Sequence, residues 1–232
     1  MQAISLLLLL GSFHRLELLH HCHGMAVLSA GGMAQVDGPY LDLPSQQLLI
    51  LSMAIRPVLR IGDPRLRQVA QPVEALGTAQ LLALVDDLRD TMAAGNGVGL
   101  VAPQIGVPLR VMIFKVTCNP RYPEAPPIPE TILINPCITP LSPERSNGWE
   151  GCLSVPGMRG LVPRWEHIRY QGVDSEGNNI NRSVDGFHAR LVQHEFDHLD
   201  GVLYPDRIEE RTAFGFTTEL VAAGLLPSLP QE

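Results

Sequence analysis

Two histidines four residues apart, with a glutamate directly after the first, form the stretch of the chain best suited to chemistry. His194, Glu195 and His198 lie in the string QHEFDH. On an α-helix, residues i and i+4 lie one above the other on a single face, so both imidazoles can reach one metal ion. The Glu195 carboxylate then lies at the edge of the same site, where it can act as a general base. This string favours a metal-dependent hydrolase over a chance pair of histidines.

The residues around this string predict the helix that the spacing requires. Apolar residues recur at three- to five-residue steps and form a stripe that can pack inward: Phe187, Leu191, Val192, Phe196 and Leu199. Gly186 precedes the stripe, and Gly201 follows it as a C-terminal stop. Both histidines are therefore expected inside the protein, where apolar surroundings that exclude water strengthen electrostatic interactions.

One of the four cysteines stands out as a candidate functional thiol. Cys22, Cys118, Cys137 and Cys152 show no C-x-x-C spacing, which indicates a reducing compartment with at most one functional thiol. Cys118 and Cys137 fit the usual role of a free thiol that packs as a small hydrophobe. Cys152 differs because Gly, Glu and Ser surround it rather than an apolar run.

Composition excludes several classes of function. The 232 residues suit one domain, or one domain with an extension, and 45% hydrophobic with 18% charged residues is ordinary for a globular protein. The net charge of −7 and the lack of a basic run argue against a nucleic-acid surface. No apolar run reaches the roughly 18 residues needed to span a bilayer, so no membrane association is expected.

The first 52 residues differ from the rest. They hold few charged residues but four of the eight histidines, His14, His20, His21 and His23. We interpret 1–52 as a leader that is disordered or arises from a mis-assigned start, and 53–232 as a single catalytic domain with Met53 as a sensible start. The run Ile4–Leu10 lacks a basic n-region, and the stretch lacks the Arg and Ser of a transit peptide. An organellar signal is thus the minority interpretation.

The remaining pattern predicts an α+β fold. Thr78 is a candidate N-cap for a helix that ends near Ala94, and its expected buried stripe is Leu81, Leu84, Val85, Leu88 and Met92. Strands are expected at Arg110–Val116, at Thr131–Ile134, from Ile138, at His167–Val173 and near Asn178–Val184. Asp174–Gly177 is a hairpin turn, Cys118–Pro129 a surface loop and Glu209–Ala223 a C-terminal helix. The architecture expected is short, mostly antiparallel strands packed around a central metal-binding helix, with an N-terminal and a C-terminal helix.

Three segments together resemble a known family. Gly97–Gln104, Glu150–Ser154 and Gln193–Gly201 look like the three signature motifs of peptide deformylase, in the same order. The glycines of the first segment do not form a phosphate loop, because no G-K-[ST] string follows. The similarity covers about Ala54 to Asp206, and the insert near Pro123–Pro129 resembles the longer-loop members of bacteria and organelles. The family usually has Ala at Val101 and often at Gly160, and neither change removes a ligand or a donor.

The resemblance implies a metal site. Cys152, His194 and His198 would bind one divalent ion, with water in the fourth position. In the family this ion is natively Fe²⁺, although Zn²⁺, Ni²⁺ or Co²⁺ can replace it. Thiolate and imidazole ligands suit several first-row ions, so the sequence does not rank them.

The resemblance also implies the reaction, which removes the formyl group from N-formylmethionine at the N-terminus of newly made proteins. Metal-bound hydroxide would attack the formyl carbon, with Glu195 as general base and then acid. The Gln104 amide and the Leu153 backbone N–H would stabilise the oxyanion.

Main-chain groups would hold the substrate peptide as an added strand, and these belong to Val98, Gly99 and Gly151. Glu150 and Arg159 would be neighbours of the site or a structural ion pair. The implied partners are the formylated N-termini of nascent chains, and hence transiently the ribosome exit region. The implied location is the bacterial cytoplasm.

Two other interpretations stay open at this stage. A zinc endopeptidase would use the same two histidines with a downstream third ligand, for which Glu219 is available, and would leave Cys152 without a role. A non-enzymatic binding module would use the metal for stability alone, with Glu195 only neutralising charge.

Overall fold

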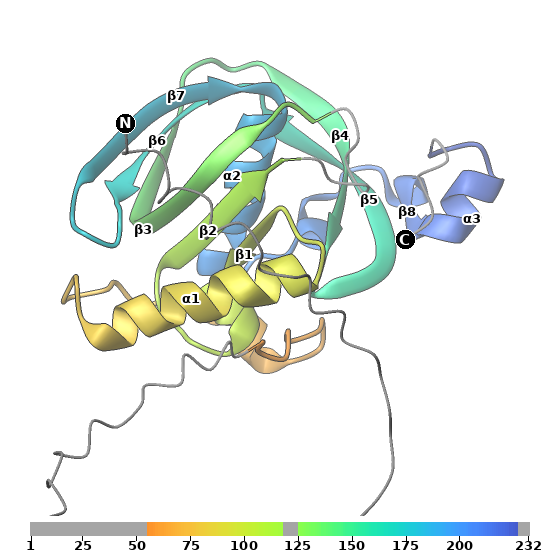
Figure 1. Ribbon diagram of the computed structural model, residues 1–232. Helices are drawn as coiled ribbons and strands as arrows, with labels where there is room; N and C mark the ends of the chain where they lie inside the picture. The colour runs from red at the N-terminus through yellow and green to blue at the C-terminus, as the bar shows by residue number, and fades with distance from the viewer. Residues whose placement is uncertain (1–54, 118–124, 227–232) are drawn as a thin grey trace, which may run out of the picture. The chain divides into compact units, whose positions relative to one another are not determined.

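The computed structural model describes residues 55–117 and 125–226. In this part of the chain, two antiparallel sheets pack around the helix that carries His194 and His198 (Figure 1). The described residues belong to one compact unit. The leader at 1–52, its histidines, Cys22 and Cys118 lie outside the described residues. Among those described, no helix is long and apolar enough to cross a membrane.

The larger sheet of the described chain has five strands in the order β1-β2-β3-β6-β7. Its strands are β1 (Gly99–Val101), β2 (Val111–Val116), β3 (Ile128–Pro140), β6 (His167–Val173) and β7 (Asn179–Asp185). The smaller sheet has the order β4-β5-β8, with β4 (Arg145–Cys152), β5 (Val155–Trp165) and β8 (Phe214–Phe216). Every paired neighbour is antiparallel, which confirms the predicted α+β class.

Helix α2 (Gly186–Leu199) is the central helix predicted from the histidine spacing. It contacts strands of both sheets, and its apolar stripe packs into the core with Phe114 and Tyr170 of the larger sheet. The helix ends where predicted, because Gly201 adopts a φ of 72°, a left-handed conformation that glycine accepts without steric cost.

Strand β2 separates two apolar layers. Met112 and Phe114 face the layer that contains α2, whereas Val111 and Ile113 face the layer that contains α1 (Ala79–Ala94). Side chains alternate between the two faces of a strand, so a strand buried on both faces must be apolar throughout. This explains the unbroken Val111–Phe114 run.

Helix α1 lies across the outer face of the larger sheet (Figure 1). Its predicted cap is present, since the Thr78 hydroxyl accepts a hydrogen bond from Leu81 N at 3.2 Å. The predicted stripe is buried at all five positions. Short 3₁₀ helices occur at Pro64–Arg67, Ala102–Ile105, Tyr204–Arg207 and Arg211–Ala213.

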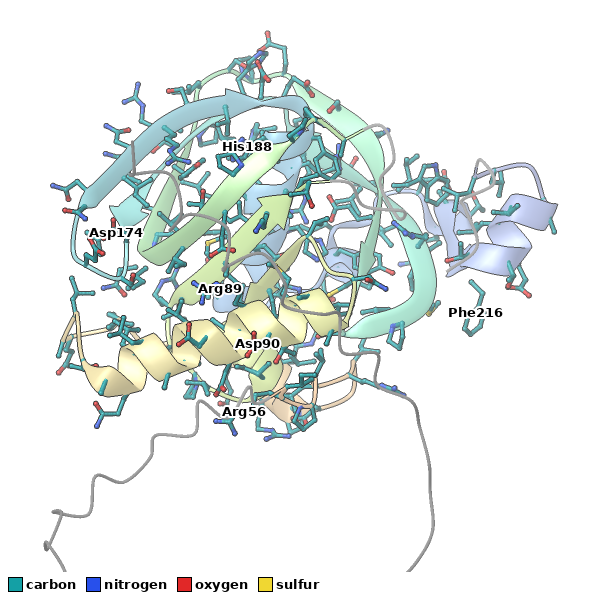
Figure 2. The ribbon with its side chains drawn as sticks, in the orientation of Figure 1. Arg56, Arg89, Asp90, Asp174, His188 and Phe216 are labelled. Atoms are coloured by element: carbon teal, nitrogen blue, oxygen red, sulfur yellow. The ribbon has the colours of Figure 1, made fainter. Side chains whose placement is uncertain are left out.

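The β6–β7 turn is the hairpin turn predicted at Asp174–Gly177, and the Asp174 side chain stabilises it (Figure 2). Its Oδ1 accepts hydrogen bonds from the backbone N–H groups of Glu176 and Asn178, each at 2.9 Å. Gly177 then takes a φ of 90°. The carboxylate replaces backbone partners that the turn leaves unpaired.

Three predicted elements differ in the structure. The strands expected at Thr131–Ile134 and from Ile138 are one strand, β3, whose pairing with β6 shifts register between Ile134 and Cys137. β3 begins at Ile128, so the predicted loop to Pro129 ends earlier. A bulge of this kind bends a strand without ending it, and Asn135 has a φ of 50° there.

The predicted C-terminal helix Glu209–Ala223 is wrong in its first half. A 3₁₀ turn and strand β8 occupy it, and only α3 (Thr217–Ala222) is α-helical. Phe214, Gly215 and Phe216 pair with residues of β5, so tertiary pairing overrides the local helical pattern. Strands β1, β4, β5 and β8 were not predicted.

The buried face of α1 gives a test of the fold. Leu88→Ala should lower the free energy of unfolding by about 2–5 kcal/mol, since Leu88 is 0% exposed and its loss leaves a cavity. Leu82→Ala on the same helix should change it by less than about 0.5 kcal/mol, because Leu82 is 45% exposed. Urea denaturation measures both, and equal losses would contradict this packing.

Candidate active site

Cys152, His194 and His198 come together in the structure as the sequence predicts. Their potential ligand atoms all lie within 4.8 Å of one another, and all three residues are buried. Cys152 Sγ and His198 Nε2 are 3.2 Å apart. The histidine rings project from successive turns of α2, with centroids 5.1 Å apart. Cys152 lies at the end of β4, in the smaller sheet.

The β4–β5 hairpin places the sulfur. Cys152 pairs with Val155, so Leu153 and Ser154 form a tight turn between the two strands. The pairing shifts register between Glu150 and Cys152, and a shift of this kind re-aims the side chains that follow it. The thiol therefore meets the face of α2 that carries the histidines.

This cluster fits a divalent cation. Burial alone would raise the pKa of the Cys152 thiol, but the imidazoles of His198 and His194 outweigh it and hold that pKa well below its usual value. A thiolate with two imidazoles is a set of three protein ligands, the number typical of catalytic metal sites. Two further buried atoms, Glu195 Oε2 and His198 Nδ1, have no hydrogen-bond partner among the described residues. Unpaired polar atoms beside such a donor set indicate a site that binds an ion or a polar ligand.

Glu150 orients one of the rings. Its Oε2 lies 2.8 Å from His194 Nδ1, an arrangement in which Nδ1–H donates to the carboxylate and Nε2 is left free for a metal. Arg164 donates to both Glu150 oxygens, at 2.9 and 3.0 Å, and Arg190 donates to Oε1 at 2.9 Å. Burial favours the neutral acid, yet Arg164 and His194 hold the pKa of Glu150 well below its usual value.

These partners of Glu150 were not found from the sequence. The sequence pointed to Glu150 and Arg159, and both are buried, but the guanidinium groups on the Glu150 carboxylate belong to Arg164 and Arg190. Arg164 also pairs with Asp197 of α2, which Arg207 binds from the other side at 2.7 Å. A chain of ion pairs thus ties the smaller sheet to α2, the helix that carries His194 and His198.

Glu195 lies against the backbone of Gly99 on β1. A Cβ atom added at Gly99 would come within 2.2 Å of Glu195 Oε1, so a larger residue there would have to displace the carboxylate. Burial raises the pKa of Glu195 to about 7. A carboxylate with this pKa is well matched to proton transfer near neutral pH.

Gln104 reaches the site from the 3₁₀ turn after β1. Its amide nitrogen lies 3.4 Å from Cys152 Sγ, and its side chain is buried. The Val101 backbone N–H donates to its Oε1 at 3.0 Å. Val101, where the family usually has Ala, is fully buried, so its extra methyl groups are accommodated beside this loop.

A cavity connects these groups. Its lining includes the residues predicted to bind the peptide main chain, Val98, Gly99 and Gly151, together with Gln104 and Leu153. Strands β1 and β4, which both contribute lining residues, are edge strands of their sheets. Phe187, Leu191 and Trp149 add apolar surface. The cavity thus joins the Cys152 and His194 end of the site to two sheet edges and an apolar wall.

Glu219, the alternative third ligand of a peptidase, does not join this site. It is exposed on α3, and the cluster found among the described residues consists of Cys152, His194 and His198. Within the described part of the chain, the candidate ligand set is therefore the one that includes the thiol.

Comparison with known proteins agrees with this geometry. The polypeptide deformylase family model matches residues 55–213. The chain belongs to the polypeptide deformylase family. Peptide deformylase 1 of Nitrosomonas europaea is 59% identical to it over 166 residues, which cover 72% of this chain and 94% of the relative. Peptide deformylase 2 of Ralstonia nicotianae is 56% identical over 176 residues, covering 76% and 97%.

A solved structure adds a three-dimensional match. The class I type b peptide deformylase from Acinetobacter baumannii, bound to Met-Ala-Ser, has a TM-score of 0.65 and 41% identity, and the match covers 67% of this chain and 99% of that one. The present chain is thus a deformylase, an enzyme that removes the N-formyl group from nascent peptides in a metal-dependent reaction. The endopeptidase and binding-module interpretations are wrong.

The contact between Gly99 and Glu195 can be tested in this deformylase. Gly99→Ala should lower kcat at least about 100-fold, since the added methyl group displaces the carboxylate that is expected to move the proton. Gly215→Ala is the matched control, because its Cβ would meet only Leu220 atoms at 3.6 Å or more. Formate release and thermal melting measure activity and folding. Full activity of Gly99→Ala would contradict the close approach.

Proposed function

We propose that this deformylase acts on N-formylmethionyl peptides through one divalent cation held by Cys152, His194 and His198, with Glu195 as the general base. The observation that carries the proposal is that the three ligand atoms lie within 4.8 Å of one another, beside a cavity lined by Cys152, His194, Glu195 and Gln104. Each has a distinct part in hydrolysing a formamide bond. Full-length protein assayed on formyl-Met-Ala-Ser tests it directly.

The proposed native ion is Fe²⁺, with Zn²⁺, Ni²⁺ or Co²⁺ able to replace it. Thiolate and imidazole donors are compatible with each of these ions. When bound, such an ion supplies Lewis acidity and lowers the pKa of water. Glu150 keeps the His194 ring in the orientation in which Nε2 faces the ion.

Glu195 moves the proton in the proposed mechanism. Its pKa of about 7 lets it accept a proton from the attacking water and later return it to the leaving amine. Its Oε2 has no hydrogen-bond partner among residues 55–117 and 125–226, and this supports the role because such a buried carboxylate oxygen can accept a hydrogen bond from water.

Two donors stabilise the charge that develops on the formyl oxygen. Gln104 offers its side-chain amide and Leu153 its backbone N–H at the β4–β5 turn. Fixed donors of this kind stabilise a tetrahedral oxyanion more than the planar substrate. Both residues line the same cavity, as expected for groups that bind one small oxygen.

The substrate peptide binds as an added strand, held by main-chain groups of Val98, Gly99 and Gly151. The edge positions of β1 and β4 support this mode, since a strand at the edge of a sheet has one side along which a further strand can be added. The relative from A. baumannii with Met-Ala-Ser bound supports a methionyl peptide as the ligand class.

The setting we propose is the bacterial cytoplasm, close to the ribosome exit region where formylated chains emerge. The bacterial relatives support it. The family match begins at residue 55, which supports a catalytic domain that starts near residue 53, after a leader at 1–52.

Glu195→Gln tests the general base. The variant should keep its metal, because Glu195 is not one of the three ligands, and should lose about 10²–10⁴-fold in kcat on formyl-Met-Ala-Ser. Elemental analysis and formate release provide the two readouts. Glu176→Gln, in the exposed β6–β7 turn, should leave both unchanged. An unaltered rate for Glu195→Gln would defeat the assignment.

Sensitivity to oxygen tests the identity of the ion. Enzyme purified with its native metal should lose activity faster in air than under nitrogen, since oxygen attacks ferrous iron and the Cys152 thiolate. The same protein reloaded with Ni²⁺ is the control and should show similar half-lives in both atmospheres. Equal half-lives for the native enzyme would point to zinc or nickel.

A further inference from the structure

The Gln104 amide is held at both ends. The Val101 backbone N–H donates to its Oε1 at 3.0 Å, and its Nε2 donates to the Ser154 hydroxyl at 3.2 Å. Gln104 is 2% exposed and Ser154 is 0% exposed, so water does not compete for these bonds. Exchanging the oxygen and nitrogen of the amide would place donor against donor at Val101. The two contacts therefore fix which end of the amide faces the site.

The Ser154 contact also fixes where the second N–H of the amide points. A carboxamide nitrogen has two N–H groups. Ser154 Oγ takes one of them, and the other is directed at Cys152 Sγ, 3.4 Å away. That N–H is the one available to a substrate oxygen bound beside the thiolate.

Ser154 is itself held in place by the backbone. Its N–H donates toward Cys152 Sγ at 3.4 Å, and its carbonyl accepts from Ile61 N at 2.8 Å. Two residues earlier in the chain, Leu59 N donates to the Gln104 carbonyl at 2.8 Å. One short segment, 59–61, thus ties the loop that carries Gln104 to the turn that carries Ser154.

We propose that Ser154 is a positioning residue for the reaction: its hydroxyl holds the Gln104 amide in the orientation that donates to the formyl oxygen in the transition state. Ser154 does not touch the substrate and acts only through Gln104. This inference rests on the proposed function, in which Gln104 is the side-chain donor. It also explains why a hydroxyl, rather than a methyl group, is buried in this turn.

The expected effect lies in kcat. Without the hydroxyl, Nε2 loses a buried partner, and the amide can rotate to seek another. Ser154→Ala should lower kcat on formyl-Met-Ala-Ser about 10-fold and leave KM and metal content within about twofold, because the interaction strengthens only in the transition state. Ser154→Cys, with a weaker acceptor of similar size, should fall between the wild type and Ser154→Ala.

A double-mutant cycle separates positioning from a general structural role. In the Gln104→Ala background, Ser154→Ala should lower kcat by less than about twofold, because the amide it positions is gone. A merely structural role would instead lower kcat equally in both backgrounds, and that result would overturn the proposal. An unchanged kcat for both Ser154 variants in the wild-type background would overturn it as well.

The control removes a buried hydroxyl elsewhere. Thr131 is 3% exposed, and its hydroxyl binds Arg182 and the Pro129 carbonyl within the core of the larger sheet. Thr131→Val should leave kcat unchanged, although it can lower the melting temperature. If the wild type and Thr131→Val both fail to release formate, the proposed function fails. If both are active and the cycle shows no coupling, only the role of Ser154 fails.

Discussion

Acidic side chains are concentrated in the core of this deformylase, and their charge has to be balanced there. Glu150, Cys152 and Glu195 are each at most 5% exposed. An isolated buried anion is strongly unfavourable, so each needs a cation or a proton close by. Arg164 and Arg190 balance Glu150, the imidazoles and the proposed ion balance Cys152, and a raised pKa lets Glu195 carry a proton. Much of the architecture can be understood as the placement of these partners.

The need for balance explains why two sheets and a helix must meet at one point. Glu150 and Arg164 come from the hairpin of the smaller sheet, while Arg190 and Asp197 come from α2. Arg164 bridges the two carboxylates, because a guanidinium has five N–H donors in a planar fork. The same contacts that neutralise Glu150 therefore fix α2 against the hairpin. The same ion pairs therefore hold the site rigid and balance the charge in the core.

The local parts of this arrangement could be predicted from the sequence, and the long-range parts could not. The spacing of His194 and His198 and the Thr78 cap are signals within a few residues, and both correctly predicted their helices. Strands β4 and β5 escaped prediction because their glycines, prolines and arginines interrupt the two-residue alternation. No local pattern marks Arg164, Arg190 or Ser154, because each contacts a residue at least 14 positions away in the chain. The motif resemblance located the site, but only coordinates could reveal what supports it.

The ligand set is divided between a hairpin and a helix, with Cys152 and His198 46 positions apart in the chain. An unfolded polypeptide does not hold these atoms together, so a cation held by the proposed ligands would bind the native state in preference to the denatured ensemble. Thermodynamic linkage then makes the ion a stabilising ligand: each tenfold rise in its free concentration above Kd adds about 1.4 kcal/mol to stability. The supply of metal would in this way change the stability of the folded protein, quite apart from catalysis.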